Sequence, residues 1–145
     1  MPLVDANLLN FQYPEQSRAI PAGHEALFKR AAALEPRERL LLELAFKENL
    51  SVRQIAKIFE RPAGTISRQL QRLCARLRDP IVAALLEPQC VLAPQIRALA
   101  IAYFAQGKRL EDLAREHDLT RTRVRNVLHF VRGWYRGVHL NAQAV

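Results

Sequence analysis

Apolar residues recur at helical spacing along most of this 145-residue chain. Between positions 24 and 34, for example, Leu27, Phe28, Ala31 and Leu34 fall on one face of a helix. Alternation of apolar and polar residues, which predicts strands, never persists over several residues. The pattern therefore predicts an all-α fold, with helices over about 24–34, 36–49, 51–59, 63–78, 80–86, 94–106, 109–117 and 120–136.

The residues at the ends of these segments are typical of helix termini. Proline is favoured in the first turn, short hydroxyl and carboxylate side chains act as N-caps, and glycine closes a helix. A mostly extended arm is predicted for residues 1–21, where Pro2, Pro14 and Pro21 are spread; whether Met1 to Leu9 dock on the body is left open. The predicted terminal residues are Pro36, Pro80 and Pro94 in first turns, Ser51, Asp79 and Thr120 as N-caps, and Gly107 as a C-cap.

The hydrophobic pattern also recurs at an offset of 58 residues. Positions that differ keep their physical character, as with Ile55 and Leu113 or Glu60 and Asp118. A repeat of this length predicts one folding unit copied once. We predict an arm at 1–21, a first helix-turn-helix unit at 22–79, a second at 80–139 and a tail at 140–145, joined by helix 80–86 rather than by a flexible linker. The identical pairs are Leu34/Leu92, Pro36/Pro94, Arg39/Arg97, Leu41/Leu99, Phe46/Phe104, Ala56/Ala114, Leu70/Leu128 and Arg78/Arg136.

The chain is strongly basic, with a net charge of +8 and a pI near 10.3. Excess positive charge fits nucleic acid, an anionic lipid surface or an acidic protein. Its placement favours nucleic acid over two merely solvated helix faces, because windows 61–78 and 119–136 contain no acidic residue. These windows hold Arg61, Arg68, Arg72, Arg76 and Arg78, and Arg121, Arg123, Arg125, Arg132 and Arg136.

Several classes of function are disfavoured by the sequence. No apolar run reaches the roughly 18 residues that span a bilayer, and no basic segment followed by an apolar one opens the chain, so we expect a cytoplasmic, nucleoid-associated protein of bacterial or phage type with no membrane partner. Cys74, predicted to be buried, and Cys90 are not expected to form a disulfide. The histidines lack zinc-site spacing relative to the cysteines. We expect no metal, no cofactor and no enzymatic activity, because no catalytic constellation or Gly-rich phosphate loop is present.

The segment 109–136 has the parts of a helix-turn-helix: a short helix, a turn at 117–119 and a basic helix capped by Thr120. Its apolar stripe, Val124, Val127, Leu128 and Val131, is expected to pack on Leu110, Leu113 and Ala114, whereas Trp134 and Tyr135 are expected to be core or interface anchors. The opposite face carries side chains suited to base edges in a major groove. The predicted base readers are Arg121, Thr122, Arg125, Asn126 and His129, and Arg123, Arg132 and Arg136 are predicted to bind phosphates.

The run from Arg109 to Val127 resembles region 4 of primary bacterial sigma factors, the helix-turn-helix that reads the −35 promoter element. The first copy is similar to the same region of extracytoplasmic-type sigma factors, over 34–39, 50–56 and 64–68. The resemblance implies DNA reading by Arg121, Arg125 and Asn126. Thr122 stands where primary sigma factors usually have an acidic residue. No segment is long enough for region 2, so a regulator built from region 4 modules is implied rather than a complete sigma factor.

The first copy departs further from the pattern. Arg61 replaces the apolar turn residue, Pro62 replaces the capping hydroxyl, and Ala63 and Gly64 stand where Arg121 and Thr122 lie in the second copy. We predict base reading by Ser67 and Arg68, and phosphate binding by Thr65, Arg72 and Arg76. The second copy is therefore the predicted main reader, and the first adds phosphate affinity, weaker readout or a protein contact.

These observations favour a sequence-specific regulator of transcription that binds double-stranded DNA in the major groove. One alternative is an adaptor or anti-activator that binds RNA polymerase or a regulator. Another is an accessory protein in DNA packaging or recombination of a mobile element. Homodimerisation, the target sequence and the direction of regulation are left open.

Overall fold

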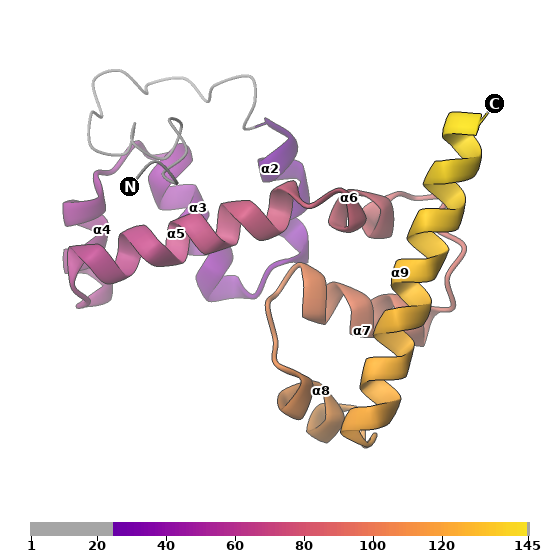
Figure 1. Ribbon diagram of the computed structural model, residues 1–145. Helices are drawn as coiled ribbons and strands as arrows, with labels where there is room; N and C mark the ends of the chain where they lie inside the picture. The colour runs from indigo at the N-terminus through magenta and orange to yellow at the C-terminus, as the bar shows by residue number, and fades with distance from the viewer. Residues whose placement is uncertain (1–24, 145) are drawn as a thin grey trace. The chain divides into compact units, whose positions relative to one another are not determined.

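The computed structural model describes residues 25–144, and the side chains of residues 25–139. The described chain forms eight α-helices and contains no strand, as the hydrophobic pattern predicted. It divides into two compact units, 1–77 and 78–145, each of which is described by itself below (Figure 1). The arm predicted at 1–21 lies outside the described residues.

The first unit is a set of helices around a single core. Pro36 occupies the first turn of its helix, and Ser51 forms a capping box in which its hydroxyl accepts from the Gln54 N–H while the Gln54 side chain accepts from the Ser51 N–H. The elements are α2 (Glu25–Arg30), a 3₁₀ turn (Ala31–Ala33), α3 (Pro36–Phe46), α4 (Val52–Phe59) and α5 (Ala63–Arg78).

The core of the first unit gathers apolar side chains from all of these helices. Leu42, Ile55 and Leu70 are each fully buried, and Cys74, as predicted, is a buried free thiol. The Arg30 guanidinium donates to the Leu77 carbonyl and so connects α2 to the end of α5. Burial of this many large aliphatic side chains supplies the main stabilisation of the unit.

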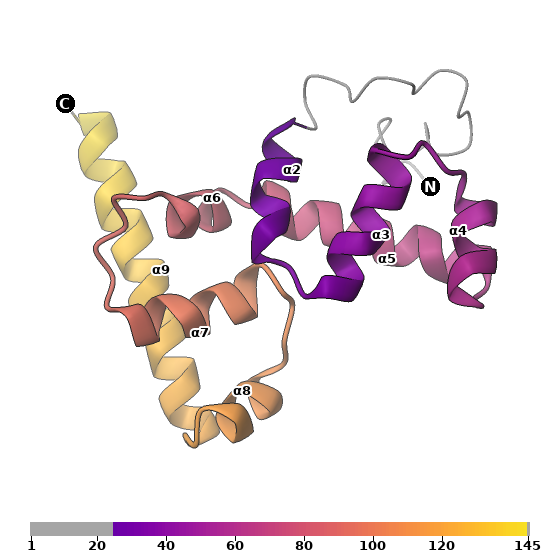
Figure 2. The same ribbon diagram turned by 180° about the vertical axis from the view of Figure 1, so that it is seen from behind.

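The second unit begins where Asp79 caps the next helix, accepting a 3.0 Å hydrogen bond from the Ile81 N–H. Its elements are α6 (Pro80–Leu86), α7 (Pro94–Phe104), α8 (Leu110–Glu116) and α9 (Arg121–Ala144). Arg97 donates to the carbonyls of Leu85 and Glu87, at 2.8 and 3.3 Å, and so fastens α7 to the end of α6. Figure 2 shows α8 beside the N-terminal part of α9.

The core of the second unit has two clusters. In one, Leu113 and Ala114 of α8 pack with Val124 and Leu128 of α9, which confirms the predicted contact between these helices. Val131 was expected in the same group but packs instead with α6 and α7, because α9 extends beyond the end of α8. Trp134 and Tyr135 are half-buried against that second cluster, in agreement with their predicted anchoring role.

Several backbone features of the two units lie 58 residues apart. Helices α3 and α7 begin at Pro36 and Pro94, and a non-helical turn residue with positive φ follows each of them, Asn49 at 55° and Gly107 at 70°. Gly107 was predicted to close α7; the helix ends three residues earlier, and Gly107 supplies the left-handed turn. The matching hydrogen bonds are Glu48 N–H to Glu43 O and Gln106 N–H to Ile101 O, Leu50 N–H to Leu44 O and Lys108 N–H to Ala102 O, and Arg61 N–H to Ala56 O and Leu119 N–H to Ala114 O.

Helix α9 is longer than the sequence pattern predicted. It continues from the expected end at position 136 to Ala144, although Gly133 and Gly137 weaken helix propensity. Trp134 and Tyr135 hold this part of the helix against the core. None of the described helices is long and apolar enough to span a membrane.

Candidate nucleic-acid interface

The turn between α8 and α9 sets the direction of the basic helix. Asp118 adopts a left-handed conformation with φ of 53°, and the Leu119 N–H returns to the Ala114 carbonyl at 2.8 Å. The Thr120 hydroxyl then accepts from the Arg123 N–H at 3.1 Å, which confirms the predicted N-cap. The helix-turn-helix geometry in this unit is therefore fixed by short-range backbone and capping bonds.

The polar face of α9 is exposed along its first half. Val124 and Leu128 are buried on the opposite face, so the helix cannot rotate without exposing its core contacts. The exposed face presents guanidinium, amide, hydroxyl and imidazole groups. It contains all five predicted base readers of this unit, Arg121, Thr122, Arg125, Asn126 and His129.

Most of these side chains have no partner within the described part of the chain. Arg125, Asn126 and His129 make no hydrogen bond or ion pair there. Arg121 forms an ion pair with Glu111 of α8 at 3.2 Å, with both side chains more than half exposed. A pair so exposed contributes little to stability, so Arg121 can exchange Glu111 for an external anion.

The predicted phosphate-binding residues of α9 flank this face. Arg123, Arg132 and Arg136 are all exposed. The Arg132 guanidinium lies over the Phe104 ring, 5.3 Å from its centroid, an interaction that orients the side chain while leaving its charge available.

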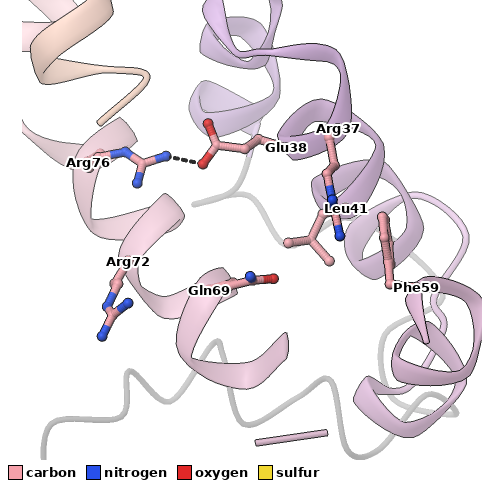
Figure 3. Close-up of a pocket in the computed structure, with 7 residues that line it drawn as sticks. All are labelled: Arg37, Glu38, Leu41, Phe59, Gln69, Arg72 and Arg76. Carbon is pink, nitrogen blue, oxygen red and sulfur yellow. Dashed lines mark hydrogen bonds and ion pairs between the residues drawn. The ribbon is translucent and has the colours of Figure 1, made fainter. Parts of the chain in front are cut away.

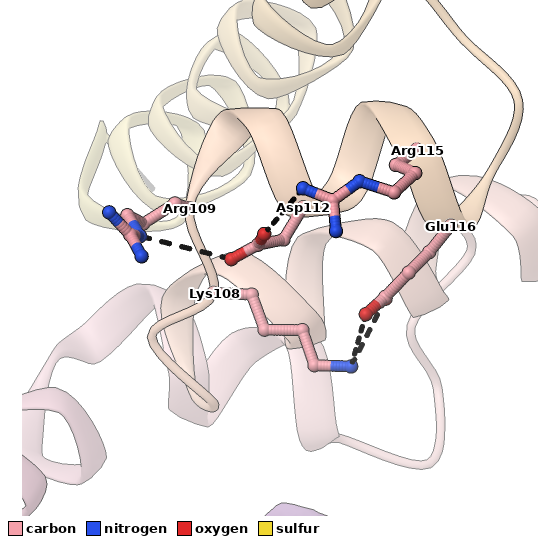
Figure 4. A network of polar contacts seen from close by, with 5 residues as sticks. All are labelled: Lys108, Arg109, Asp112, Arg115 and Glu116. Atoms are coloured by element: carbon pink, nitrogen blue, oxygen red, sulfur yellow. Dashed lines mark hydrogen bonds and ion pairs between the residues drawn. The ribbon is translucent and has the colours of Figure 1, made fainter.

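The charges of α8 are largely compensated by their neighbours, in contrast to those of α9. Asp112 pairs with Arg115 at 3.2 Å and lies 3.8 Å from Arg109 (Figure 4). Glu116 accepts from Lys108 at 3.1 Å. Because no acidic residue follows Asp118 in the chain, the positive potential of this unit is concentrated along α9.

The corresponding helix of the first unit has a different surface. Glu60 adopts the left-handed conformation before it, with φ of 54°, but no hydroxyl caps the helix because Pro62 precedes it. Arg68 is exposed and lies 3.4 Å from the Thr65 hydroxyl. Ser67 and Thr65 are half-buried, whereas Arg72 is exposed. Of the predicted base readers on α5, only Arg68 is well exposed.

The structure places one predicted phosphate-binding residue in a site that sequence reasoning missed. Arg76 forms an ion pair with Glu38 of α3, at the edge of a pocket of about 190 Å³ between α3, the end of α4 and α5 (Figure 3). The pocket is lined by Arg37, Glu38, Leu41, Phe59, Gln69, Arg72 and Arg76. Its parts are up to 39 positions apart in the chain, so no local motif reveals them.

Metal or covalent chemistry gains no support from the described residues. They include no group of three or more His, Cys, Asp or Glu side chains arranged to hold a metal ion. Cys90, like Cys74, is a free thiol.

Comparison with known proteins identifies part of the chain. Residues 31–79 match the family described as Sigma-70, region 4. No curated protein and no solved structure matches the chain. The match covers about a third of the sequence and lies in the first unit, which carries the less typical recognition helix. A second region 4 domain is not shown by this comparison. This all-helical chain thus contains one sigma-70 region 4 domain, a helix-turn-helix typical of non-enzymatic DNA-binding proteins, which suggests a role in DNA binding or transcription.

Proposed function

We propose that this protein is a sequence-specific regulator of transcription that binds double-stranded DNA through two helix-turn-helix units of the same kind. Helix α9 is the principal base-reading helix. Helix α5 contributes phosphate affinity and weaker readout. No catalytic step is involved in this function.

The case for a second helix-turn-helix unit rests on the matching backbone geometry of the two units. Left-handed residues occupy Glu60 and Asp118, 58 positions apart, and each is followed by a return hydrogen bond from the next N–H to the preceding short helix. The basic helices then begin at Ala63 and Arg121, again 58 positions apart. Unrelated three-helix arrangements have no reason to share this spacing at every turn.

The observation that carries the functional proposal is the exposed polar face of α9. Arginine can donate two hydrogen bonds to guanine, and asparagine can bond both the N6 and N7 positions of adenine. Arg125 and Asn126 are exposed and have no partner among the described residues, so neither must break an internal bond to reach a base. The hydrophobic contacts of Val124 and Leu128 fix the direction in which both point.

The first turn of α5 does not offer the same groups. Ala63 and Gly64 occupy the positions that correspond to Arg121 and Thr122. Arg68 and Arg72 remain exposed and can bind phosphates. If both helices enter successive major grooves on one face of DNA, their sites lie about 10 base pairs apart.

The test is binding to a pool of genomic DNA fragments at two salt concentrations, followed by sequencing of the bound fraction. We expect the wild type to enrich a motif, and the Arg121→Ala/Arg125→Ala variant to lose it. The matched control is Arg109→Ala/Arg115→Ala, which removes the same charge from α8, where both arginines lie beside Asp112. Binding without a motif that weakens steeply with salt would instead indicate an architectural role.

A second candidate function is an adaptor that binds RNA polymerase or another regulator. The atypical first turn of α5 and the pocket beside it favour this reading for the first unit. Its test is co-purification of polymerase that persists after nuclease treatment. Loss of the complex with nuclease would show that DNA, rather than protein, connects the two.

A further inference from the structure

The pocket of the first unit combines positive charge with an apolar floor. Leu41 of α3 and the Phe59 ring form its apolar part, and the Arg37 guanidinium lies over that ring, 5.5 Å from the centroid. Arg72 and Arg76 come from α5 on the other side (Figure 3). The volume of about 190 Å³ suits one side chain or a short segment of an extended peptide rather than a folded element.

The polar groups of the pocket are unequally satisfied. Arg76 is engaged by Glu38, whereas Arg72 is exposed and makes no hydrogen bond or ion pair with the described residues. The second carboxylate oxygen of Glu38, Oε1, is buried and has no hydrogen-bond partner within the described protein. The pocket therefore offers guanidinium donors to an anion and one buried acceptor to an N–H group.

This combination fits a peptide better than a DNA phosphate. A phosphodiester has only acceptors, so it would meet the Glu38 carboxylate with like charge and leave its buried oxygen unsatisfied. It would also make no use of Leu41 and Phe59. An acidic peptide can place carboxylates on Arg37 and Arg72, a backbone N–H on Glu38, and an apolar side chain on the pocket floor.

The positions 58 residues later carry different chemistry. Arginine at 37, 72 and 76 is replaced by Gln95, Phe130 and Trp134, and Glu38 by Ile96. A contact with the DNA backbone common to both units would call for basic residues at both sets of positions. The charged pocket is a property of the first unit alone.

We propose that this pocket binds an acidic peptide segment of a partner protein that presents a leucine or aromatic side chain between its carboxylates. The first unit then connects the protein to a partner while α9 engages DNA. This inference does not depend on base reading by α9, since the pocket residues lie in the other unit.

The experiment uses the full chain and a fluorescein-labelled ten-residue peptide in which Asp and Glu alternate with Leu and Phe. Binding is followed by fluorescence anisotropy, and the site is located by changes in amide chemical shifts. The control peptides replace the acids with Asn and Gln, or the apolar residues with Ala. Arg37→Ala removes an exposed pocket arginine, and Arg53→Ala is the matched control on the exposed surface of α4.

We expect the acidic apolar peptide to bind at the pocket and both control peptides to bind at least about tenfold more weakly, since hydrogen bonds to charged groups have this magnitude. Arg37→Ala should weaken peptide binding about tenfold and leave DNA affinity within about twofold, whereas Arg53→Ala should change neither. The proposal is overturned if the peptide does not bind, if the shifts map outside the pocket, or if Arg37→Ala weakens DNA and peptide binding equally. Loss of DNA binding in α9 variants alone tests the proposed function and leaves this result unchanged.

Discussion

The two units share a backbone arrangement but present different chemistry on corresponding surfaces. In the first, Pro62, Ala63 and Gly64 open α5, and a charged pocket lies beside it. In the second, Thr120 caps α9, whose exposed first turn continues into a polar face. The buried positions keep the fold, while the exposed positions are free to differ. The difference teaches that similarity of fold within one chain does not imply the same ligand for both units.

The largest expected effect concerns the separate cores of the two units. Ile55 and Leu113 lie 58 positions apart and are both fully buried. Ile55→Ala and Leu113→Ala should each lower the free energy of unfolding of the unit that contains it by about 2–5 kcal/mol, because each leaves a cavity. Hydrogen exchange measured by mass spectrometry should show lost protection in α3–α5 for the first and in α7–α9 for the second. Equal loss in both units from either substitution would mean that they unfold together.

The next effect separates the recognition helices. Arg125→Ala should lower affinity for the preferred site by about 1–3 kcal/mol, because a bidentate base contact is lost. Ser67→Ala, at the corresponding position of α5, should change affinity by less than about 0.5 kcal/mol, as at an ordinary surface position. Titration of labelled duplex at constant salt measures both. A larger loss from Ser67→Ala would reverse the assignment of the two helices.

The helix caps allow a smaller but closely matched comparison. Ser51→Ala and Thr120→Ala each remove a side-chain acceptor from a helix N-terminus and should cost about 0.5–2 kcal/mol of stability. Only Thr120→Ala should also weaken DNA binding, because its helix carries the base readers. Thermal unfolding and duplex titration, made on the same samples, separate the two effects. An equal effect of both substitutions on DNA binding would contradict the division between the units.

The smallest expected effect is a gain in affinity. Glu111→Gln removes the carboxylate that pairs with Arg121 and should strengthen DNA binding by about 0.2–1 kcal/mol at low salt. Glu116→Gln makes the same change of charge next to Lys108 instead, and should have less effect. The two substitutions need to be compared at the same ionic strength. Equal gains from both would assign the effect to net charge alone.

The local features of this fold could be predicted from the sequence, because their causes lie within a few residues. Ser51 bonds Gln54, Thr120 bonds Arg123, and the spacing of Val124 and Leu128 indicates the buried face of α9. These contacts depend only on helical geometry. The exposure of the base readers followed from the same periodicity.

The remaining features depend on contacts between distant positions. Glu38 and Arg76 meet across 38 residues, and Arg132 lies over Phe104 from another helix. Neither pairing leaves a periodic trace in the sequence. The extension of α9 through Gly133 was missed for a related reason, since packing of Trp134 on the core outweighs the low helix propensity of glycine.

The central claim, that α9 reads bases and α5 does not read them to the same extent, is tested most directly at one pair of corresponding positions. Asn126 and Arg68 lie 58 residues apart on the two helices. Selection and sequencing of bound DNA should be carried out in parallel for the wild type, Asn126→Ala and Arg68→Ala. We predict that Asn126→Ala loses preference at one base pair of the motif, whereas Arg68→Ala keeps the motif and binds all sequences more weakly. A motif unchanged by Asn126→Ala but altered by Arg68→Ala would contradict the account.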